Sequence, residues 1–271
     1  MGSVFKILLA LLFVMVFCHC KASNIEAISK ILKQKDYNKL NTYLSSLSED
    51  CSVSRLIERE VMPDCWEVKI QYQEFYPGDE PGVTTVNSYY IEILTEKGQI
   101  VYCCFSDHKY LNAPETILNY KVDKEYKKLS EAHQDAYGAE LNFSHLFVNN
   151  DSIVYGSHCG WAGINPGYRS KLDDAVKLMD TALLNAWLSS TITELQVYAV
   201  DGFYQLKQKG YVPDDKTLER IALVKSKKGT INQCSGCIYM NREISEAGRF
   251  QILTGKSDTK SSISNYSRVR T

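Results

Sequence analysis

The spacing of apolar residues along this chain changes twice, and this constrains the fold more than any other feature of the sequence. Between residues 24 and 47, apolar residues recur every three or four positions on either side of the polar stretch KQKDYN, which predicts a short helical hairpin. In 65–78 and 88–110, apolar residues alternate with polar ones, as they do in strands with one buried face. Helical spacing returns from about Gly160. The pattern predicts an α+β fold, in which an antiparallel β-rich unit is flanked by an N-terminal helical hairpin and by C-terminal helices.

These changes divide the chain into consecutive parts. We expect, in order, a signal peptide (1–22), an N-terminal helical segment (23–62), an antiparallel α+β unit (63–156), a cysteine-containing helical unit (157–245) and a polar, flexible tail (246–271). Within the α+β unit, Gly98 can adopt the positive φ of a hairpin turn. A further strand pair is expected around residues 149–151, and residues 122–141 are expected to form a polar helix.

The cysteine-containing helical unit is expected to hold three helices. Apolar residues at helical spacing in 168–190 predict a first helix with one apolar face. The pattern TITE that follows resembles a capping box, with Thr191 as N-cap and Glu194 three residues later. The second helix would then end before Gly210, and a third would begin near Pro213.

Two stretches of the sequence are similar, DYNKLNTYLSS at 36–46 and DTALLNAWLSS at 180–190. A helix that ends in LSS and is followed by a second helix rich in small residues resembles one unit of a HEAT-like repeat. Two imperfect units cannot form a solenoid, which needs at least about three stacked repeats. We therefore expect HEAT-like packing of the C-terminal helices and no solenoid.

The first 22 residues have the features of a secretory signal peptide. Lys6 precedes an apolar run at 7–17, which is too short to span a bilayer, and small residues precede a cleavage site after Ala22. Attachment of a lipid at Cys18 or Cys20 is the less favoured alternative, because bulky residues precede both cysteines. The sequence thus predicts an exported protein, periplasmic or extracellular.

Removal of the signal peptide takes away two lysines and no acidic residue, so the net charge changes from −1 to −3. A nearly neutral chain without long runs of one charge is not expected to bind nucleic acid. No motif for a cofactor is present, and the histidines lack the spacing of a metal site. We therefore expect no cofactor, no metal and no catalytic residue.

Seven of the nine cysteines follow the signal peptide, and in an oxidising compartment most of them should pair. We expect Cys51 to pair with Cys65, and Cys159 to pair with either Cys234 or Cys237. Since seven is an odd number, at least one thiol stays free in a monomer. Cys103 and Cys104 are adjacent in a predicted strand, so their side chains point to opposite faces, and one of them is expected to be the free thiol.

The motif Cys234-Ser-Gly-Cys237 has three interpretations. A redox dithiol would need a βαβ context, which the surrounding pattern lacks. A zinc site would need four ligands, and the sequence holds a single CxxC motif. A thiol enzyme would need a base, yet no histidine follows His158. A structural disulfide is therefore favoured, and a thiol-dependent enzyme or redox protein that uses Cys234 and Cys237 stays open as the alternative.

Glycine and proline residues after Cys159 predict a tight loop with Trp161 packed under it. Residues 156–240 also resemble a group of uncharacterised exported bacterial proteins. The shared pattern is Gly-x-x-Cys-Gly-x-x-Gly-x-x-Pro, a helical unit and then Cys-Ser-Gly-Cys-Ile-Tyr, and it is matched here by Gly156, Cys159, Gly160, Gly163, Pro166 and residues 234–239. The resemblance implies export and brings no assigned activity.

Tyrosine is abundant, with 18 residues, and tyrosine is enriched at recognition surfaces. A candidate binding surface on or beside the sheet consists of Tyr72, Tyr76, Tyr89, Tyr90 and Tyr102. In the alternative interpretation, these residues only fill a half-buried sheet face. Taken together, the sequence favours an exported, non-enzymatic binding protein, such as a periplasmic immunity or adaptor protein, whose partner is another protein.

Overall fold

The computed structural model describes residues 24–78, 82–108, 113–147 and 153–247. The predicted signal peptide with Cys18 and Cys20, the expected turn at 149–151 and nearly all of the predicted tail lie outside these ranges. The chain divides into two compact units, Met1–Ser130 and Glu131–Thr271. No described helix has both the length and the apolar character that are needed to cross a membrane.

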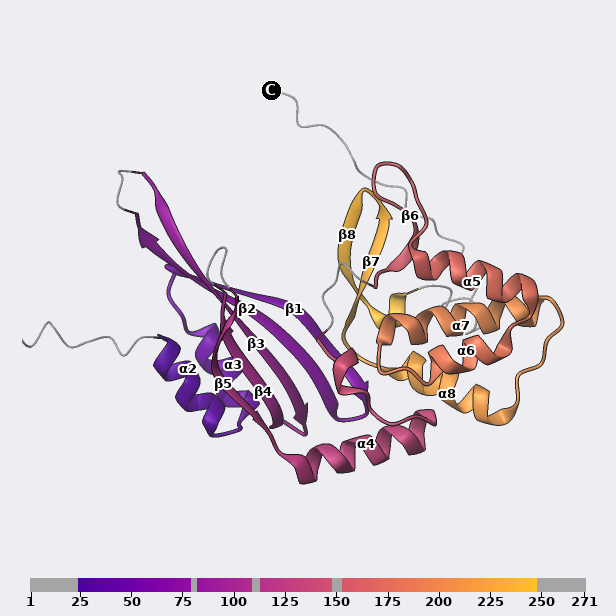
Figure 1. Ribbon diagram of the computed structural model, residues 1–271, viewed down its shortest axis with the longest axis horizontal. Coiled ribbons are helices and arrows are strands. Elements are labelled where there is room, and N and C mark those ends of the chain that lie inside the picture. The colour runs from indigo at the N-terminus through magenta and orange to yellow at the C-terminus, as the bar shows by residue number, and fades with distance from the viewer. Residues whose placement is uncertain (1–23, 79–81, 109–112, 148–152, 248–271) are drawn as a thin grey trace, which may run out of the picture. The chain divides into compact units, whose positions relative to one another are not determined.

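The first unit is an antiparallel sheet with two helices on one face (Figure 1). The five strands pair in the order in which they follow one another along the chain. Its elements are α2 (Asn24–Lys33), α3 (Tyr37–Ser45), β1 (Cys51–Met62), β2 (Cys65–Pro77), β3 (Thr84–Glu96), β4 (Gln99–Asp107), β5 (Glu115–Lys121) and the first part of α4 (Asp123–Tyr137). The predicted α+β fold, with its N-terminal helical hairpin, is confirmed.

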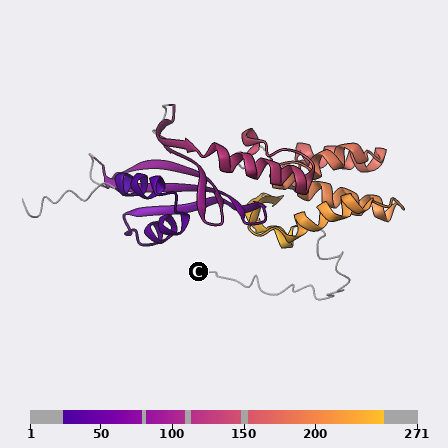
Figure 2. The same ribbon diagram turned by 90° about the horizontal axis from the view of Figure 1, so that it is seen from below.

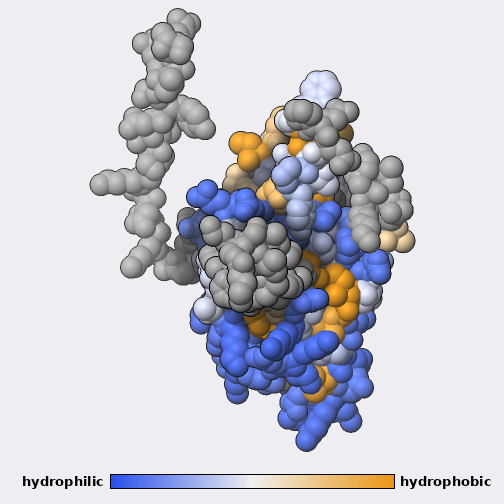
Figure 3. All heavy atoms as spheres, turned by 90° about the vertical axis from the view of Figure 1, so that its left-hand side faces the viewer, coloured by the Kyte–Doolittle hydropathy of each residue, from blue (hydrophilic) through white to orange (hydrophobic). Residues whose placement is uncertain are grey.

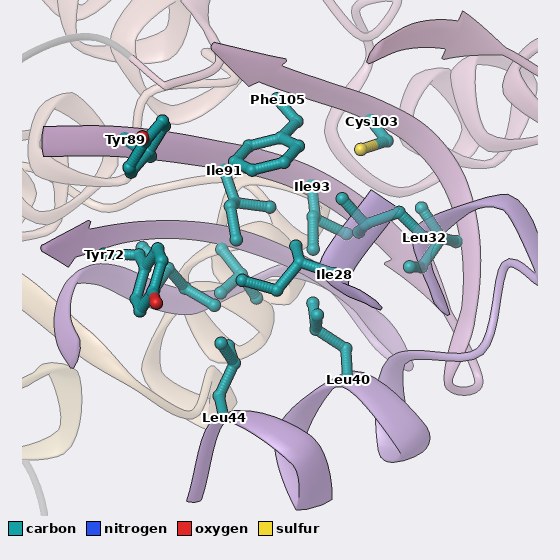
Figure 4. Packing of buried hydrophobic residues seen from close by; sticks show 13 residues of the cluster. Ile28, Leu32, Leu40, Leu44, Tyr72, Tyr89, Ile91, Ile93, Cys103 and Phe105 are labelled. Carbon is teal, nitrogen blue, oxygen red and sulfur yellow. The ribbon is translucent and has the colours of Figure 1, made fainter. Parts of the chain in front are cut away.

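The helical hairpin closes the core of this unit. Asp36 caps α3, because its carboxylate accepts a hydrogen bond from the backbone N–H of Lys39 at 3.0 Å. Leu40 and Leu44 of α3, together with Ile28 and Leu32 of α2, lie against the apolar face of the sheet (Figure 4). The alternation of apolar residues along β2, β3 and β4 produces that face.

Residues 51–62 correct one prediction, because they form strand β1 although the predicted helical segment extended to residue 62. Strand β1 pairs with β2 along nearly its whole length. Every residue from Arg59 to Met62 is buried, two of them charged, so this end of the strand shows no apolar alternation in the sequence. Strand β5, which the sequence also did not predict, is mostly exposed and carries little apolar signal.

The second unit combines four helices with a small sheet (Figures 1 and 2). Strand β6 pairs with β7 in parallel, and β7 pairs with β8 in antiparallel orientation. Besides the end of α4, its elements are η1 (Phe143–His145), β6 (Tyr155–Cys159), α5 (Gly167–Leu178), α6 (Thr181–Leu188), α7 (Thr193–Gln208), α8 (Asp215–Ser226), β7 (Thr230–Gly236), β8 (Ile238–Glu243) and η2 (Ile244–Glu246). Helix α7 is central, since every residue from Thr193 to Phe203 is buried.

The first C-terminal helix is two helices, not the single one predicted for 168–190. Met179 ends α5 in a left-handed conformation, with φ 57°. Asp180 then caps α6 by accepting a hydrogen bond from the N–H of Leu183 at 3.0 Å. Helical spacing continues across the break, which is why the periodicity does not reveal it.

The predicted capping box at Thr191 and Glu194 is wrong. The N-cap of α7 is Ile192, one residue later, and it makes no side-chain hydrogen bond. The hydroxyl of Thr191 instead accepts a hydrogen bond from the N–H of Asn142 at 2.9 Å, and the Glu194 carboxylate accepts one from the N–H of Asn232 in β7 at 3.2 Å. Contacts with residues distant in the sequence thus replace the local cap.

The strand pair expected around residues 149–151 lies largely outside the described residues, so it stays a prediction. Of its described part, β6 pairs in parallel with β7, which the sequence did not indicate. The two strands are separated by all four helices α5–α8. A parallel pair needs such a long connection, whereas the prediction assumed a local hairpin.

Candidate binding surface at the disulfide-linked loops

A disulfide bond joins the two parallel strands of the second unit. Cys159 at the end of β6 is bonded to Cys234 in β7, and their Cα atoms are 5.6 Å apart. This confirms the predicted pairing of Cys159 with one cysteine of the CxxC motif. Directly beyond the bond, the N–H of Gly160 donates to the carbonyl of Gly236 at 2.8 Å, so the loop after β6 is fastened to the turn between β7 and β8.

Gly156 lets the strands approach closely enough for this bond. A Cβ atom at residue 156 would lie 2.3 Å from the carbonyl oxygen of Cys234 and 2.7 Å from its Sγ. The hydroxyl of Tyr198 in α7 accepts a hydrogen bond from the N–H of Gly156 at 3.0 Å and can donate to the carbonyl of Val154 at 2.9 Å. Burial raises the pKa of Tyr198 to about 12, which keeps the phenol protonated.

The loop after Cys159 is closed by its own backbone. Cys159 and Ile164 exchange two hydrogen bonds, of 2.8 and 3.0 Å. Gly160 and Gly163 adopt positive φ within it, which glycine does without strain. The prediction that Trp161 packs under this loop is wrong: the Trp161 side chain lies at the tip and is 92% exposed.

Large apolar side chains are exposed on both fastened loops. The loop after β6 exposes Trp161 and Ile164, and the start of β8 exposes its apolar run. Both loops lie at the same end of the second unit (Figure 1). We call this set the tip surface, and its members, with their exposed fractions, are Trp161 (92%), Ile164 (69%), Ile238 (60%), Tyr239 (62%) and Met240 (43%). The set extends over both faces of the β7–β8 hairpin, because Ile238 and Met240 point to one face of β8 and Tyr239 to the other.

Figure 3 shows one face of the molecule, on which hydrophilic residues predominate and hydrophobic ones show in separate areas. Single exposed apolar side chains such as Leu178 and Val212 occur elsewhere, whereas the tip surface has five on two linked segments. Trp, Tyr and Met are enriched in protein interfaces, and clustered exposed apolar groups mark interaction sites. The backbone hydrogen bonds and the disulfide hold the tip surface in place before any partner arrives, which lowers the entropic cost of binding.

The thiol of Cys237 is free and exposed in the turn between β7 and β8. Because Cys234 is bonded to Cys159, the two cysteines of the CxxC motif do not form a dithiol pair in this structure. The described residues hold no group of three or more histidine, cysteine or acidic side chains that could bind a metal ion.

The predicted pairing of Cys51 with Cys65 is wrong. Neither cysteine forms a disulfide bond, and they lie at opposite ends of the β1–β2 pair, where Cys51 is paired with Glu74 and Cys65 with Met62. Two cysteines that close a short stretch of sequence are kept apart when that stretch is an extended strand. The expectation that most cysteines pair is therefore also wrong.

Cys103 and Cys104 point to opposite faces of β4, as predicted. Cys103 lies in the core and Cys104 is partly exposed on the other face. Burial raises the pKa of both thiols above the ordinary value, so neither is an activated nucleophile.

A polar cluster surrounds Cys51 in the first unit. The buried carboxylate of Glu74 accepts hydrogen bonds from the hydroxyl of Tyr72 at 2.6 Å, from the amide of Asn24 at 3.2 Å and from the hydroxyl of Tyr76. The thiol of Cys51 lies 3.3 Å from the Tyr72 hydroxyl. Burial raises the pKa of Tyr72, which therefore stays a donor. The cluster fastens the start of α2 to the sheet.

The predicted tyrosine surface does not exist as one exposed patch. Tyr72 and Tyr89 are stacked in the core with ring centroids 5.8 Å apart, and Tyr102 is only 8% exposed. Tyr90 points to the opposite face from Tyr89, and Tyr76 is the most exposed of the five, at 44%. The alternation of the strand sends neighbouring tyrosines to different faces, so a count of tyrosines is no measure of a surface.

Comparisons with known proteins give no further guide. No protein-family model matches the chain, and neither a curated protein nor a solved structure matches it. The tip surface is therefore known from the structure alone. The sequence does hold a signal for it, because three large apolar residues follow Cys237 without alternating with polar ones.

Proposed function

We propose that this protein is an exported, non-enzymatic binding protein, and that its tip surface docks against another protein. The observation that carries the proposal is the exposure of five large apolar side chains on two loops that a disulfide fixes together. A periplasmic immunity or adaptor role is the specific form that we favour. The disulfide supports export, since such bonds persist in oxidising compartments. The HEAT-like arrangement of the helices behind this surface stays a prediction.

A photo-crosslinking experiment tests the proposal. A photoreactive amino acid is placed at Trp161 in the full-length protein, and in a control at Leu178, which is also apolar and 74% exposed but lies at the end of α5. We expect one defined protein adduct at residue 161 and none at residue 178, when both are irradiated in extracts of the cells that make the protein. Equal adduct patterns at both positions would refute a specific surface.

Alanine variants then measure how much the tip surface contributes. We expect Trp161→Ala combined with Tyr239→Ala to weaken binding to the crosslinked partner by at least about tenfold, because exposed Trp and Tyr are the residues that dominate protein interfaces. The matched control, Leu178→Ala combined with Val212→Ala, removes two apolar side chains that are 74% and 82% exposed elsewhere. If the two double variants weaken the complex equally, the proposal fails.

A further inference from the structure

Helix α4 buries very few of its side chains. Its buried side chains are Leu129, His133 and Tyr137, which are spaced four residues apart and so form one stripe. The division between the two compact units falls inside this helix, after Ser130. On the second unit's side, the attachment of α4 therefore depends on His133 and Tyr137, both of which are fully buried.

His133 is a neutral imidazole in this position. Its Nδ1 lies 2.7 Å from the carbonyl oxygen of Ala139 and therefore carries the proton and donates. Its Nε2 is buried and has no hydrogen-bond partner among the described residues. A second proton could only be placed on Nε2, where it would find no acceptor.

A buried cation, Lys227, lies near His133, against the neighbouring ring of Tyr137. The ammonium of Lys227, which follows α8, is 4.9 Å from the centroid of the Tyr137 ring and donates to the Gln196 side chain at 2.6 Å. The Tyr137 ring in turn lies 4.9 Å from the ring of His133. Among the described groups, Lys227 is the charge that acts on His133, and it opposes protonation.

We propose that α4 is an acid-released latch, in which protonation of His133 at Nε2 detaches the C-terminal half of α4, with Tyr137, from Lys227. A protonated His133 would put a second buried cation next to Lys227 and leave one N–H unsatisfied. Release of α4 removes both penalties, because each cation is then solvated.

The direction in which pH changes the attachment of α4 follows from the pKa of His133 in the attached and in the released helix. Burial and Lys227 lower the pKa of His133 from 6.5 to about 4 while α4 is attached. The released helix exposes a histidine of ordinary pKa, so the released state binds the proton more tightly. The attachment is therefore fully stable above about pH 6.5 and weakens as the pH falls towards 4.

Hydrogen–deuterium exchange of the full-length protein between pH 7 and pH 4, corrected for the intrinsic pH dependence of exchange, tests the latch. We expect the population in which the peptide covering 131–137 is open to rise by about 10- to 100-fold by pH 4.5, before peptides from α7 or β2 respond. The latch is refuted if α4 stays protected down to pH 4, or if it opens only together with the rest of the chain.

Two variants assign the effect to His133. His133→Gln keeps a donor for Ala139 and cannot be protonated, so its α4 should exchange equally at pH 7 and pH 4.5. His145→Gln, the same substitution elsewhere in the unit, should keep the full acid response, and an acid response retained by His133→Gln contradicts the latch. If His133→Gln does not fold, Lys227→Met tests the latch instead. Removal of the neighbouring cation should reduce the acid-induced rise in exchange of α4 by at least about threefold. An unchanged acid response in that variant overturns the latch.

Discussion

The hydroxyl of Tyr198 accepts a hydrogen bond from the N–H of Gly156 at 3.0 Å. Its one proton faces two carbonyl oxygens, that of Val154 at 2.9 Å and that of Gly156 at 3.2 Å. One side chain on the central helix α7 thus provides hydrogen-bond partners for the backbone at the start of β6, the strand that ends at Cys159. The position of the disulfide, and with it the position of the tip surface, depends on this contact.

Replacing Tyr198 with phenylalanine should destabilise the second unit. The ring still fits, but the N–H of Gly156 loses its partner, and an unsatisfied buried donor costs about 1–3 kcal/mol. Urea unfolding followed by tryptophan fluorescence measures the loss. The matched control, Tyr239→Phe, removes a hydroxyl from a residue that is 62% exposed and should leave the free energy of unfolding unchanged; equal effects of both variants would contradict the role of Tyr198.

Gly156→Ala should hinder formation of the disulfide. The new Cβ would meet both the carbonyl oxygen and the Sγ of Cys234, and overpacking of this kind costs about 1–3 kcal/mol. The intact mass of the alkylated, unreduced protein reports the bond. Gly167→Ala is the control, because a Cβ there has no neighbour within 4 Å and alanine favours the helix that begins at this residue. Full disulfide formation in Gly156→Ala at normal stability would be incompatible with our account of this glycine.

The cysteines outside the disulfide bond should react with an alkylating reagent in a fixed order. Cys237 is exposed and should react first, whereas Cys65 and Cys103 are fully buried and should react only when the protein unfolds. Cys103 is further protected because burial raises the pKa of its thiol, which keeps it in the unreactive form. Peptide mass spectrometry after increasing reaction times gives the order. Rapid native labelling of Cys103 would contradict the described packing of β4.

The ion pair between Arg59 and Glu67 should be sensitive to the loss of one partner. The Arg59 Nε and a Glu67 carboxylate oxygen are 2.9 Å apart, and both side chains are at most 3% exposed. Glu67→Ala removes a carboxylate that contacts the buried guanidinium, and loss of one partner of a buried pair costs about 3–5 kcal/mol, while the double change Arg59→Met and Glu67→Leu should cost much less. Thermal unfolding of the three proteins compares them. A double variant less stable than Glu67→Ala would contradict this expectation.

The sequence predicted those parts of the fold that local patterns determine. Alternation located β2, β3 and β4, and helical spacing located α2, α3 and α4. The failures occur where distant contacts decide. Thr191 and Glu194 have the spacing of a cap but accept hydrogen bonds from the backbone of Asn142 and of Asn232 in β7. No local pattern reveals that β6 pairs with a strand beyond four helices.

The candidate site was predicted only in part. The pairing of Cys159 with the CxxC motif is confirmed, because loop residues and cysteines mark both ends of the bond. The exposed position of Trp161 was missed, because a large aromatic residue among glycines is ordinarily expected to pack inward. The choice of tyrosines failed because exposure depends on which face of a strand a residue occupies and on what covers that face, and the helices α2 and α3 cover the face of Tyr72 and Tyr89.

The bond between Cys159 and Cys234 turns the helical part of the second unit into a covalent ring. All four helices α5–α8 lie between the two cysteines in the sequence. A single cut by a protease anywhere on this ring leaves one molecule with two new ends, not two fragments. The strands on either side of the ring stay in register after such a cut, and so do the loops that carry Trp161 and Tyr239. Reduction alone would then release the pieces, so damage to the helices and loss of the tip surface become two separate events.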